Sequence, residues 1–365
     1  MERPQSVGNM GMYDIAIIGL GPAGAALARL LDKRFKVIAI DKKRPGGDSV
    51  SKPCGGLLAP DAQKALSRFN LVLPKEVLVD PQIFAVKTID TKQNLMRYYQ
   101  RFYMNLDRHK FDMWLISLIP KTVTIASGAT CTDVQNVGNL FKITYTQNGG
   151  TQMVKAKYVV GAEGANSIVR KRLLPRRQIP QYVSIQQWFS EPHQTPFYAC
   201  VFDSEVTDSY CWSISKDGYY ILGGAFPKED SRERFELLKG TLEVRQGFRL
   251  GAPVKTEACL VSMPRGIRDF CVGRDGAFLI GEAAGFISPS SLEGISYALN
   301  SAYDLAHILN KGGDDPVWVF RVKSIPMRLK LLLKYLKRPF MYWPFLRWIV
   351  MKSGLKSIRV IEKEV

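Results

Sequence analysis

The stretch YDIAIIGLGPAGAALARLLDKRFKVIAID, at residues 13–41, decides the fold of this chain. It begins with a short apolar run rich in β-branched residues, which is typical of a buried parallel strand. A glycine-rich turn follows, then a segment whose apolar residues have helical spacing, and then a second apolar run. This order predicts a strand, a helix and a second strand, which together form a βαβ unit.

The glycine turn GLGPAG has the GxGxxG spacing of a phosphate-binding loop. Gly19 permits a tight turn, Gly21 lets the backbone approach a pyrophosphate, and Gly24 allows the strand and the helix to pack closely. Pro22 and Ala23 open the predicted helix, whose free N–H groups and dipole favour a bound anion. The spacing alone is weak evidence, because plain glycine turns also occur in α/β proteins.

The end of the second predicted strand strengthens the interpretation. Asp41 stands there, 22 residues after Gly19, and Lys42 follows it. A carboxylate in this place can accept hydrogen bonds from an adenosine ribose. With its strand, helix and carboxylate in place, the motif predicts a dinucleotide site in a Rossmann-type domain.

Composition places the chain among ordinary globular proteins. It has 365 residues, of which 46% are hydrophobic and 23% charged, enough for one large core or two domains. Lys and Arg outnumber Asp and Glu by 51 to 33, and the net charge of +18 predicts an anionic partner. A phosphorylated ligand or an acidic membrane fits this charge. We expect no nucleic acid, because no known nucleic-acid-binding module occurs.

The chain has six cysteines and three histidines, which limits the metal sites and disulfides that it can form. No cysteine pair has CxxC spacing, so we expect no metal site and no disulfide framework. The polar N-terminus has no apolar run of a signal peptide, and no uncharged stretch approaches the length of a membrane span. The sequence predicts a cytoplasmic protein in a reducing compartment. A peripheral position on the inner face of the membrane stays open, and so does the oligomeric state.

The predicted secondary structure changes along the chain. Residues 175–263 alternate short β-rich pieces with turns, which predicts an antiparallel sheet, whereas GAFLIGEAAG at residues 276–285 returns to a strand–loop–helix order. We therefore predict an α/β fold, α+β overall, with a discontinuous Rossmann-type domain, an antiparallel substrate domain and a helical C-terminus. The predicted divisions are residues 12–80, 104–174 and 264–312 for the first, residues 81–103 and 175–263 for the second, and residues 313–365 for the third.

Two later stretches resemble known fingerprints. YVVGAEGANSIVRK and GAFLIGEAAGFISPSSLEGIS are similar to the second and third fingerprints of flavoprotein monooxygenases, with Glu163 and Glu282 where Asp is usual. KPCGG, DRHKFDMWL and PSSLEGIS resemble elements of the geranylgeranyl reductase family, with Leu292 where Gly is usual. That family is a branch of the p-hydroxybenzoate hydroxylase superfamily and includes bacterial CbrA-type proteins. The resemblance covers about residues 13–311.

FAD is the cofactor that the resemblance implies. Cys54 and Gly55 would then contact the flavin, since glycine lets the backbone approach a ring without an intervening Cβ. The alternative for Cys54 is a small buried residue that packs a turn. Arg108 would face the FAD pyrophosphate, and its alternative is a surface arginine in the first turn of a helix.

The resemblance also assigns the rest of the FAD site. Cys131 would contact the adenine through its backbone at the end of a strand. Gly294 and Ile295 would begin a helix that points at the pyrimidine end of the flavin, where its N-terminus stabilises negative charge. Glu293 has an alternative as an acid that complements the helix dipole. The remaining residues assigned to the second and third fingerprints are Glu163, Gly281, Glu282 and Gly285.

The substrate side is less well marked. Tyr210 and Trp212 alternate in DSYCWSIS, so in a strand they point to one face. The family's reductases have Tyr-x-Trp-x-Phe-Pro lining the substrate cavity, whereas this chain has Ile214 and Ser215 in place of Phe-Pro. Tyr210, Trp212 and Cys54 are the candidates for the substrate cavity. The alternative for the two aromatic residues is plain sheet core.

The C-terminal segment mixes Lys and Arg with Leu, Trp, Tyr and Phe. Part of it can form an amphipathic helix that lies on an anionic membrane. The alternative is a helical cap that packs on the substrate domain and exposes its lysines to water. Pro326, Pro339 and Pro344 exclude one long helix.

Three functions follow from these observations. The first is an FAD-dependent reductase that transfers hydride to C=C bonds of an apolar, isoprenoid-type substrate, with NAD(P)H or a ferredoxin-like protein as electron donor. The second is an FAD-dependent monooxygenase of an aromatic or apolar substrate. The third is a flavin-binding protein with little turnover. The flavin carries the redox chemistry, so few catalytic side chains are needed.

Overall fold

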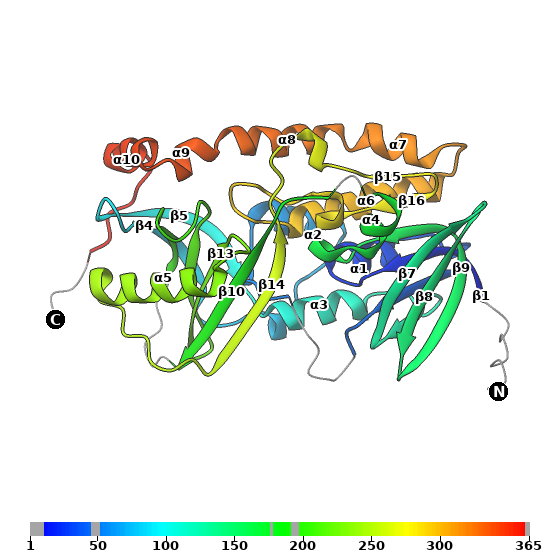
Figure 1. The fold of residues 1–365 in the computed structure, drawn as a ribbon, viewed down its shortest axis with the longest axis horizontal. Helices are drawn as coiled ribbons and strands as arrows, with labels where there is room; N and C mark the ends of the chain where they lie inside the picture. The colour runs from blue at the N-terminus through cyan, green and yellow to red at the C-terminus, as the bar shows by residue number, and fades with distance from the viewer. Residues whose placement is uncertain (1–10, 45–51, 176–177, 191–196, 362–365) are drawn as a thin grey trace.

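The computed structural model describes residues 11–44, 52–175, 178–190 and 197–361 (Figure 1). Its first sheet has the strand order β15–β16–β9–β1–β2–β6, and β8 and β7 continue from β9. β16, β9, β1, β2 and β6 pair in parallel. The strands are β1 (Gly11–Ile18), β2 (Val37–Asp41), β6 (Thr124–Ser127), β7 (Ala129–Val137), β8 (Leu140–Gln147), β9 (Gly150–Gly161), β15 (Gly273–Arg274) and β16 (Ala277–Leu279).

The predicted βαβ unit is present as β1, α1 (Pro22–Leu30) and β2. Ile15 to Ile18 are at most 2% exposed, as expected of a parallel strand that is covered on both faces. α1 packs against α6 (Ile295–Lys311), so the first motif and the third fingerprint lie together. The helices around this sheet also include α2 (Pro60–Arg68), α3 (Arg108–Ser117) and α4 (Ile168–Leu173).

The hairpin between β8 and β9 turns at Asn148 and Gly149. Asn148 and Gly149 have φ angles of 49° and 79°, and Gln147 pairs with Gly150 across the turn. A two-residue hairpin turn needs two left-handed residues, and Asn-Gly supplies them.

The second sheet has the order β14–β10–β13–β12–β11–β4–β5–β3. Its neighbours pair antiparallel, except that β11 and β4 are parallel. α5 (Ser231–Gln246) covers one face, where the Phe226 and Phe235 rings lie 5.9 Å apart. The strands are β3 (Leu57–Leu58), β4 (Ile83–Asp90), β5 (Leu95–Asn105), β10 (Gln181–Ser190), β11 (Phe197–Phe202), β12 (Cys211–Lys216), β13 (Tyr219–Phe226) and β14 (Lys255–Ser262).

The two sheets confirm the predicted fold class. β3 pairs with β5 at the edge of the second sheet, so residues 57–58 join that sheet. The short 3-10 turns are η1 (Lys75–Val77), η2 (Gly164–Asn166), η3 (Ile267–Asp269) and η4 (Gly281–Ala284).

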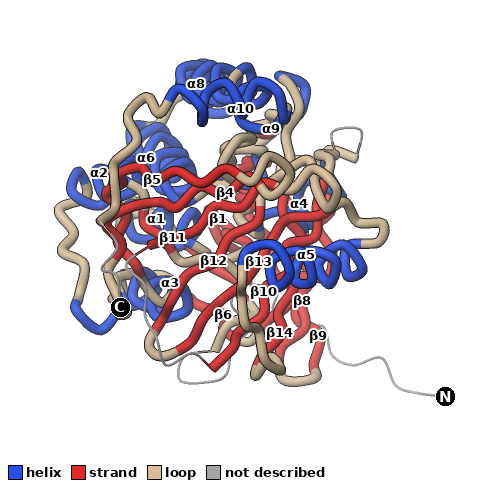
Figure 2. The backbone as a smooth tube through the Cα atoms, turned by 90° about the vertical axis from the view of Figure 1, so that its left-hand side faces the viewer, coloured by secondary structure: helices blue, strands red, loops and turns tan. Residues whose placement is uncertain are grey.

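The C-terminal segment forms a row of short helices along one edge of the molecule (Figure 1). Figure 2 shows α8 to α10 on that same edge in a view turned by 90°. The helices are α7 (Pro316–Lys323), α8 (Ile325–Leu336), α9 (Arg338–Tyr342) and α10 (Pro344–Ser353). Each has a proline in its first turn, where the missing N–H has no helical partner to lose. This confirms that the prolines divide the segment.

Among the described residues, every helix falls short of the length and apolar character that crossing a bilayer requires.

Candidate functional site

A cavity of about 1480 Å³ is lined by residues of both sheets, of the loop at residues 52–56, of the loop before α6 and of the C-terminal helices. Most of the predicted site residues line it. They are Gly19, Gly21, Pro22, Ala23, Asp41, Lys42, Cys54, Gly55, Arg108, Cys131, Glu163, Tyr210, Trp212, Glu282, Gly294 and Ile295. The lining does not include Gly24, Gly281 or Gly285.

The glycine turn shapes one end of the cavity through its backbone. A Cβ on Gly24 would lie 1.9 Å from the Gly19 carbonyl oxygen, so this glycine allows α1 to pack closely on β1. A Cβ on Gly21 would meet nothing within 4 Å, because this residue faces open space. α1 starts at Pro22 with no side-chain cap and no acid in its first turn. Its N-terminal N–H groups are therefore available to an anion in the cavity.

Two acids and two cations stand beside this turn. Asp41 accepts hydrogen bonds from the backbone N–H groups of Leu20 at 2.5 Å and Lys43 at 2.7 Å. The Lys43 Nζ lies 3.7 Å from carboxylate oxygens of both Asp41 and Asp112. The Arg108 Nε donates to Asp112 at 2.8 Å. Burial opposes the charge on Arg108, but Asp112 outweighs it and raises the Arg108 pKa, so Arg108 reaches the cavity as a fixed cation.

The sequence interpretation named Lys42 and missed Lys43. Lys42 is exposed at the cavity lining, whereas Lys43 is buried between Asp41 and Asp112. The signal was present, because residues two apart in an extended chain point to the same side, and Lys43 stands two after Asp41.

The loop at residues 52–56 lines the cavity with all five of its residues. The Cys54 Sγ accepts a hydrogen bond from the Gly56 N–H at 3.4 Å, and a Cβ on Gly55 would lie 3.6 Å from the Trp212 ring. Gly56 has a φ of +63°, and a Cβ there would come within 2.3 Å of the Leu106 carbonyl oxygen. The Gly-Gly pair therefore lets the chain pass between Trp212 and Leu106, in the segment just before α3.

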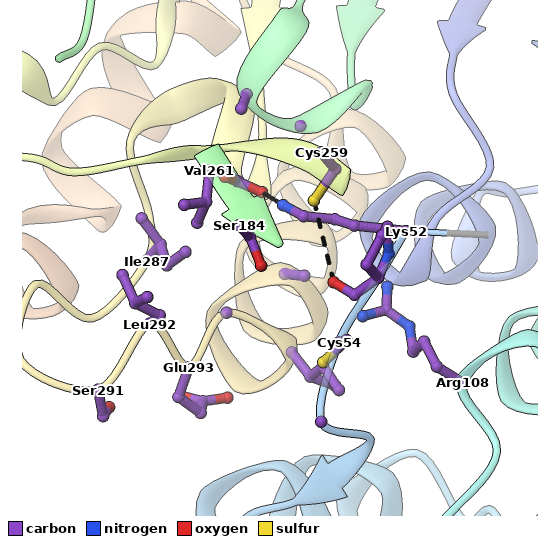
Figure 3. Close-up of a pocket in the computed structure, with 18 of the residues that line it drawn as sticks. Lys52, Cys54, Arg108, Ser184, Cys259, Val261, Ile287, Ser291, Leu292 and Glu293 are labelled. Atoms are coloured by element: carbon purple, nitrogen blue, oxygen red, sulfur yellow. Dashed lines mark hydrogen bonds and ion pairs between the residues drawn. The ribbon is translucent and has the colours of Figure 1, made fainter. Parts of the chain in front are cut away.

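Lys52, at the start of this loop, is a second residue that sequence reasoning missed. It forms an ion pair with Glu282, whose other carboxylate oxygen accepts the Ser262 N–H at 2.8 Å. Burial alone would lower the Lys52 pKa, but the charge of Glu282 reverses this and raises it. In Figure 3, Lys52, Cys54 and Arg108 lie across the cavity from Ser291, Leu292 and Glu293. The carboxylate of the third fingerprint is thus held by protein partners.

Glu163, the carboxylate of the second fingerprint, is turned toward α4. It accepts hydrogen bonds from the Ser167 hydroxyl at 2.7 Å and from the Ile168 and Val169 N–H groups at 3.0 and 3.2 Å. Burial raises the Glu163 pKa to about 7, although these hydrogen bonds oppose the rise. Glu163 therefore caps a helix start at the cavity wall and titrates near neutral pH.

The loop before α6 brings a second helix N-terminus to the cavity. Gly294 is the N-cap of α6 and Ile295 is its first residue. Glu293 accepts hydrogen bonds from the Ser296 N–H and hydroxyl, both at 2.7 Å, so it caps the helix as its alternative interpretation states. Gly281 instead packs near Ala23, where an added Cβ would lie 3.1 Å away.

Two further residues differ from their predicted settings. Gly285 packs beside the Asp269 carbonyl oxygen, 2.8 Å from the place of an added Cβ. Cys131 does not end a strand, because the chain turns at Gly128 and Cys131 becomes the third residue of β7. Burial raises the Cys131 pKa to about 12, so the thiol stays protonated.

Aromatic side chains form the opposite end of the cavity. Tyr210 and Trp212 both line it, with ring centroids 5.8 Å apart, although Tyr210 precedes β12 and only Trp212 lies in the strand. The Tyr198 hydroxyl shares a hydrogen bond with Tyr210, whose own O–H donates to the Ser291 carbonyl at 2.7 Å. Burial raises the pKa of both tyrosines well above 10. Tyr198 and Tyr103 were missed, because they lie on two other strands, β11 and β5, whose sequences carry no motif.

The C-terminal helices close this aromatic end. Their cavity-lining residues are Lys334, Phe340, Met341, Arg347, Val350 and Met351. Arg347 is 4% exposed and its Nε donates to the fully buried Asp90 at 2.7 Å. The cap expected as one alternative for this segment is thus part of the cavity wall.

These residues fit FAD. The open backbone at Gly21, the uncapped start of α1, the Asp41 carboxylate and the Arg108 cation supply what a dinucleotide needs. The cavity also exceeds the 300–1,000 Å³ or so of a typical small-ligand site, which leaves room for a substrate beside the cofactor. Among the described residues, no group of three or more His, Cys, Asp or Glu is arranged to hold a metal.

Comparisons with known proteins agree with this geometry. The model of the FAD binding domain matches residues 131–233. A geranylgeranyl bacteriochlorophyll reductase-like protein from Thermoplasma acidophilum has the same fold, with a TM-score of 0.69 and 18% identity over 95% of this chain and 88% of that one. PqsL from Pseudomonas aeruginosa, described as a probable FAD-dependent monooxygenase, has a TM-score of 0.67 and 18% identity over 94% of this chain and 100% of its own. The fold and the matched domain place this chain in the class of FAD-binding oxidoreductases.

A closer relative narrows the class. Protein CbrA from Escherichia coli O6:H1 (strain CFT073) is 50% identical over 350 residues, which are 96% of this chain and 95% of the relative. The chain belongs to the CbrA family, and the predicted resemblance is confirmed.

Proposed function

We propose that this protein reduces C=C bonds of an apolar, isoprenoid-type substrate with electrons from FAD. The observation that carries the proposal is the apolar and aromatic end of the cavity, which is continuous with the end that fits the cofactor. Its lining includes Val86, Tyr103, Tyr198, Phe202, Tyr210, Trp212, Phe340, Met341 and Met351. Such a lining suits a hydrocarbon chain.

FAD, when bound and reduced, supplies a hydride to one carbon of the double bond. The other carbon needs a proton, and the Tyr198–Tyr210 pair is placed to supply one. Both phenols keep their protons at neutral pH because their pKa values lie well above 10. Tyr198 donates to Tyr210, whose O–H donates to the Ser291 carbonyl at 2.7 Å. Tyr210 would therefore turn this O–H to the substrate and take up the Tyr198 proton in its place, and water would restore Tyr198.

The electron donor is a separate part of the proposal. NAD(P)H would supply the two electrons together as a hydride, whereas a ferredoxin-like protein would supply them in two one-electron steps. The chain as a whole carries a net charge of +18. A negatively charged donor is favoured by this charge.

A monooxygenase is the second candidate, because the fold is shared with PqsL. The two functions differ in their products, since a monooxygenase consumes oxygen and adds an oxygen atom, whereas the reductase adds hydrogen and needs no oxygen.

The test is a turnover assay on the FAD-loaded protein under anaerobic conditions. Bound FAD is reduced with NADPH, NADH or dithionite, a geranylgeranyl lipid is added, and flavin reoxidation is followed together with the product mass. We expect reoxidation coupled to gain of hydrogen, and Tyr210→Phe should slow it about a hundredfold while FAD stays bound. Tyr145→Phe is the matched control, since Tyr145 is buried in β8 outside the cavity lining.

Other outcomes separate the alternatives. An oxygenated product that forms only in air would favour the monooxygenase. FAD that binds but that no donor reduces would leave a flavin-binding protein with little turnover.

A further inference from the structure

The outer face of the C-terminal helices exposes large apolar side chains. Residues on α7 to α10 that are between 37% and 68% exposed are Trp318, Val319, Val322, Ile325, Leu329, Leu333, Leu336, Phe340, Trp343, Phe345, Trp348, Ile349 and Val350. We call this set the C-terminal apolar face. Single exposed apolar residues are ordinary, but a continuous set of this size marks an interaction surface.

The pattern on α8 shows that the exposure is systematic. Ile325, Leu329, Leu333 and Leu336 are spaced at i, i+4, i+8 and i+11, which places them in one stripe along the helix. Leu331 is fully buried against the body of the molecule, so α8 already has an inward apolar side. The stripe is therefore a second apolar side that faces away from the core.

The same helices carry cations and no acids. Between residues 316 and 353 there are nine Lys or Arg and no Asp or Glu. Arg347 pairs inward with Asp90, and Lys330 pairs with Asp61 on α2. Lys323, Lys337 and Lys352 are exposed on these helices. The apolar face thus lies within a field of positive charge.

We infer that the C-terminal apolar face docks on the surface of an anionic phospholipid bilayer. A basic helix with Trp, Phe and Leu on its other side is the composition of helices that lie in the membrane interface. Trp318, Trp343 and Trp348 have the apolar ring and polar N–H that suit the headgroup level. A second copy of this chain is a poor partner, because two such faces would bring only like charges together.

The face also borders the cavity. Phe340 and Val350 are 55% and 45% exposed and line the cavity, so its rim lies on the docking surface. An apolar substrate held in the bilayer would enter beside Phe340 without crossing water. This step of the inference rests on the proposed function, whereas the docking does not.

The test measures binding of the full-length, FAD-loaded protein to vesicles by co-sedimentation. Vesicles of phosphatidylcholine alone are compared with vesicles of phosphatidylcholine and phosphatidylglycerol, at low and high salt. We expect binding to the anionic vesicles that weakens with salt. The triple variant Leu329→Ser, Leu333→Ser and Leu336→Ser should bind at least tenfold more weakly.

A second variant tests the contribution of positive charge to vesicle binding while the apolar side chains stay unchanged. Lys323→Gln, Lys337→Gln and Lys352→Gln together should weaken binding to anionic vesicles about a hundredfold, because each lysine near the surface contributes on the order of a factor of five. None of these three residues lines the cavity. The matched control is Leu237→Ser with Val244→Ser, which removes exposed apolar side chains from α5 instead. FAD content shows that each variant is folded.

Several results would overturn the inference. They are equal binding to neutral and anionic vesicles, an equal loss in the α5 control, or unchanged binding of the leucine variant. Self-association in solution that the leucine variant abolishes, without vesicle binding, would assign the face to a second copy. Turnover of a detergent-solubilised substrate is measured separately, so failure of the proposed function leaves the vesicle result intact.

Discussion

The two ends of the cavity are built in different ways. The cofactor end is shaped largely by backbone, through the glycine turn after β1 and the starts of α1 and α6. The aromatic end is shaped by side chains from β5, β11, β12 and the C-terminal helices. Its Arg347–Asp90 ion pair joins residues 257 positions apart. A site formed by backbone can be predicted from the spacing of glycines in the sequence. A site formed by side chains from distant segments has no such local pattern.

The largest effect is expected where a Cβ meets backbone. Gly24→Val should prevent folding or FAD binding altogether, because the new Cβ would lie 1.9 Å from the Gly19 carbonyl oxygen. Gly21→Ala should fold normally, because nothing lies within 4 Å, yet bind FAD at least tenfold more weakly, since the methyl group would enter the space of a pyrophosphate. Fluorescence titration with FAD and thermal melting of the apoprotein separate the two effects.

Gly240→Ala is the control for the pair, because a Cβ there also meets open space, on α5. It should leave the FAD affinity unchanged. If Gly21→Ala bound FAD as well as the unaltered protein does, the pyrophosphate would not lie at this turn.

The aromatic end should respond to loss of a charge instead. Arg347→Met leaves Asp90 fully buried, with hydrogen bonds only from the Lys92 and Gln93 N–H groups. Removal of one partner of a buried ion pair costs about 3 kcal/mol or more. Urea unfolding should show this loss, together with faster proteolysis of α9 and α10, while FAD affinity changes little. Arg338→Met, whose partner Asp208 is largely exposed at 3.7 Å, should cost under about 1 kcal/mol.

Lys216 tests the contact between the two ends. Its Nζ, on β12, donates to the Asn105 side chain at 2.7 Å and the Leu106 carbonyl at 2.6 Å, beside the loop at residues 52–56. Burial lowers the Lys216 pKa from 10.5 to about 8. Below pH 8 the folded chain bears the full cost of this buried charge, and between pH 8 and 10.5 it releases the proton before the unfolded chain does.

Stability should therefore rise with pH in this window. Between about pH 7 and pH 9, the free energy of unfolding should rise by about 1 kcal/mol more in the unaltered protein than in Lys216→Met. Urea unfolding at both pH values measures it. Lys121→Met, at an exposed lysine, should follow the unaltered protein. Parallel behaviour of Lys216→Met would show that the amine is not desolvated.

The sequence predicted many residues of the cofactor end but few residues of the aromatic end. Gly21 and the βαβ unit were recognisable because residue spacing reports backbone geometry directly. Tyr210 and Trp212 were found because β-strand alternation is local, but Tyr198 and Arg347 come from other elements and have no local pattern. Lys43 and Lys52 were missed for another reason. The Lys52 partner, Glu282, is distant in sequence. Lys43 has a distant partner, Asp112, and also a local one, Asp41, whose spacing was visible.

The smallest effect concerns the loop where the two ends meet. Leu292 has a φ of +51°, a left-handed conformation that costs a residue with a Cβ roughly 1 kcal/mol or more. Its neighbour Ser291 fixes Tyr210, and Gly294 begins α6, so the loop serves both ends. Leu292→Gly should be more stable than Leu292→Ala by about 1 kcal/mol, because both lose the side chain and only glycine loses the strain. At Leu237, on an exposed turn of α5, the order should reverse, with alanine more stable than glycine by about 1 kcal/mol. Urea unfolding of the four variants measures both differences.

An alanine variant as stable as the glycine variant at residue 292 would mean that the loop relaxes, and then Tyr210 is not held rigidly against it.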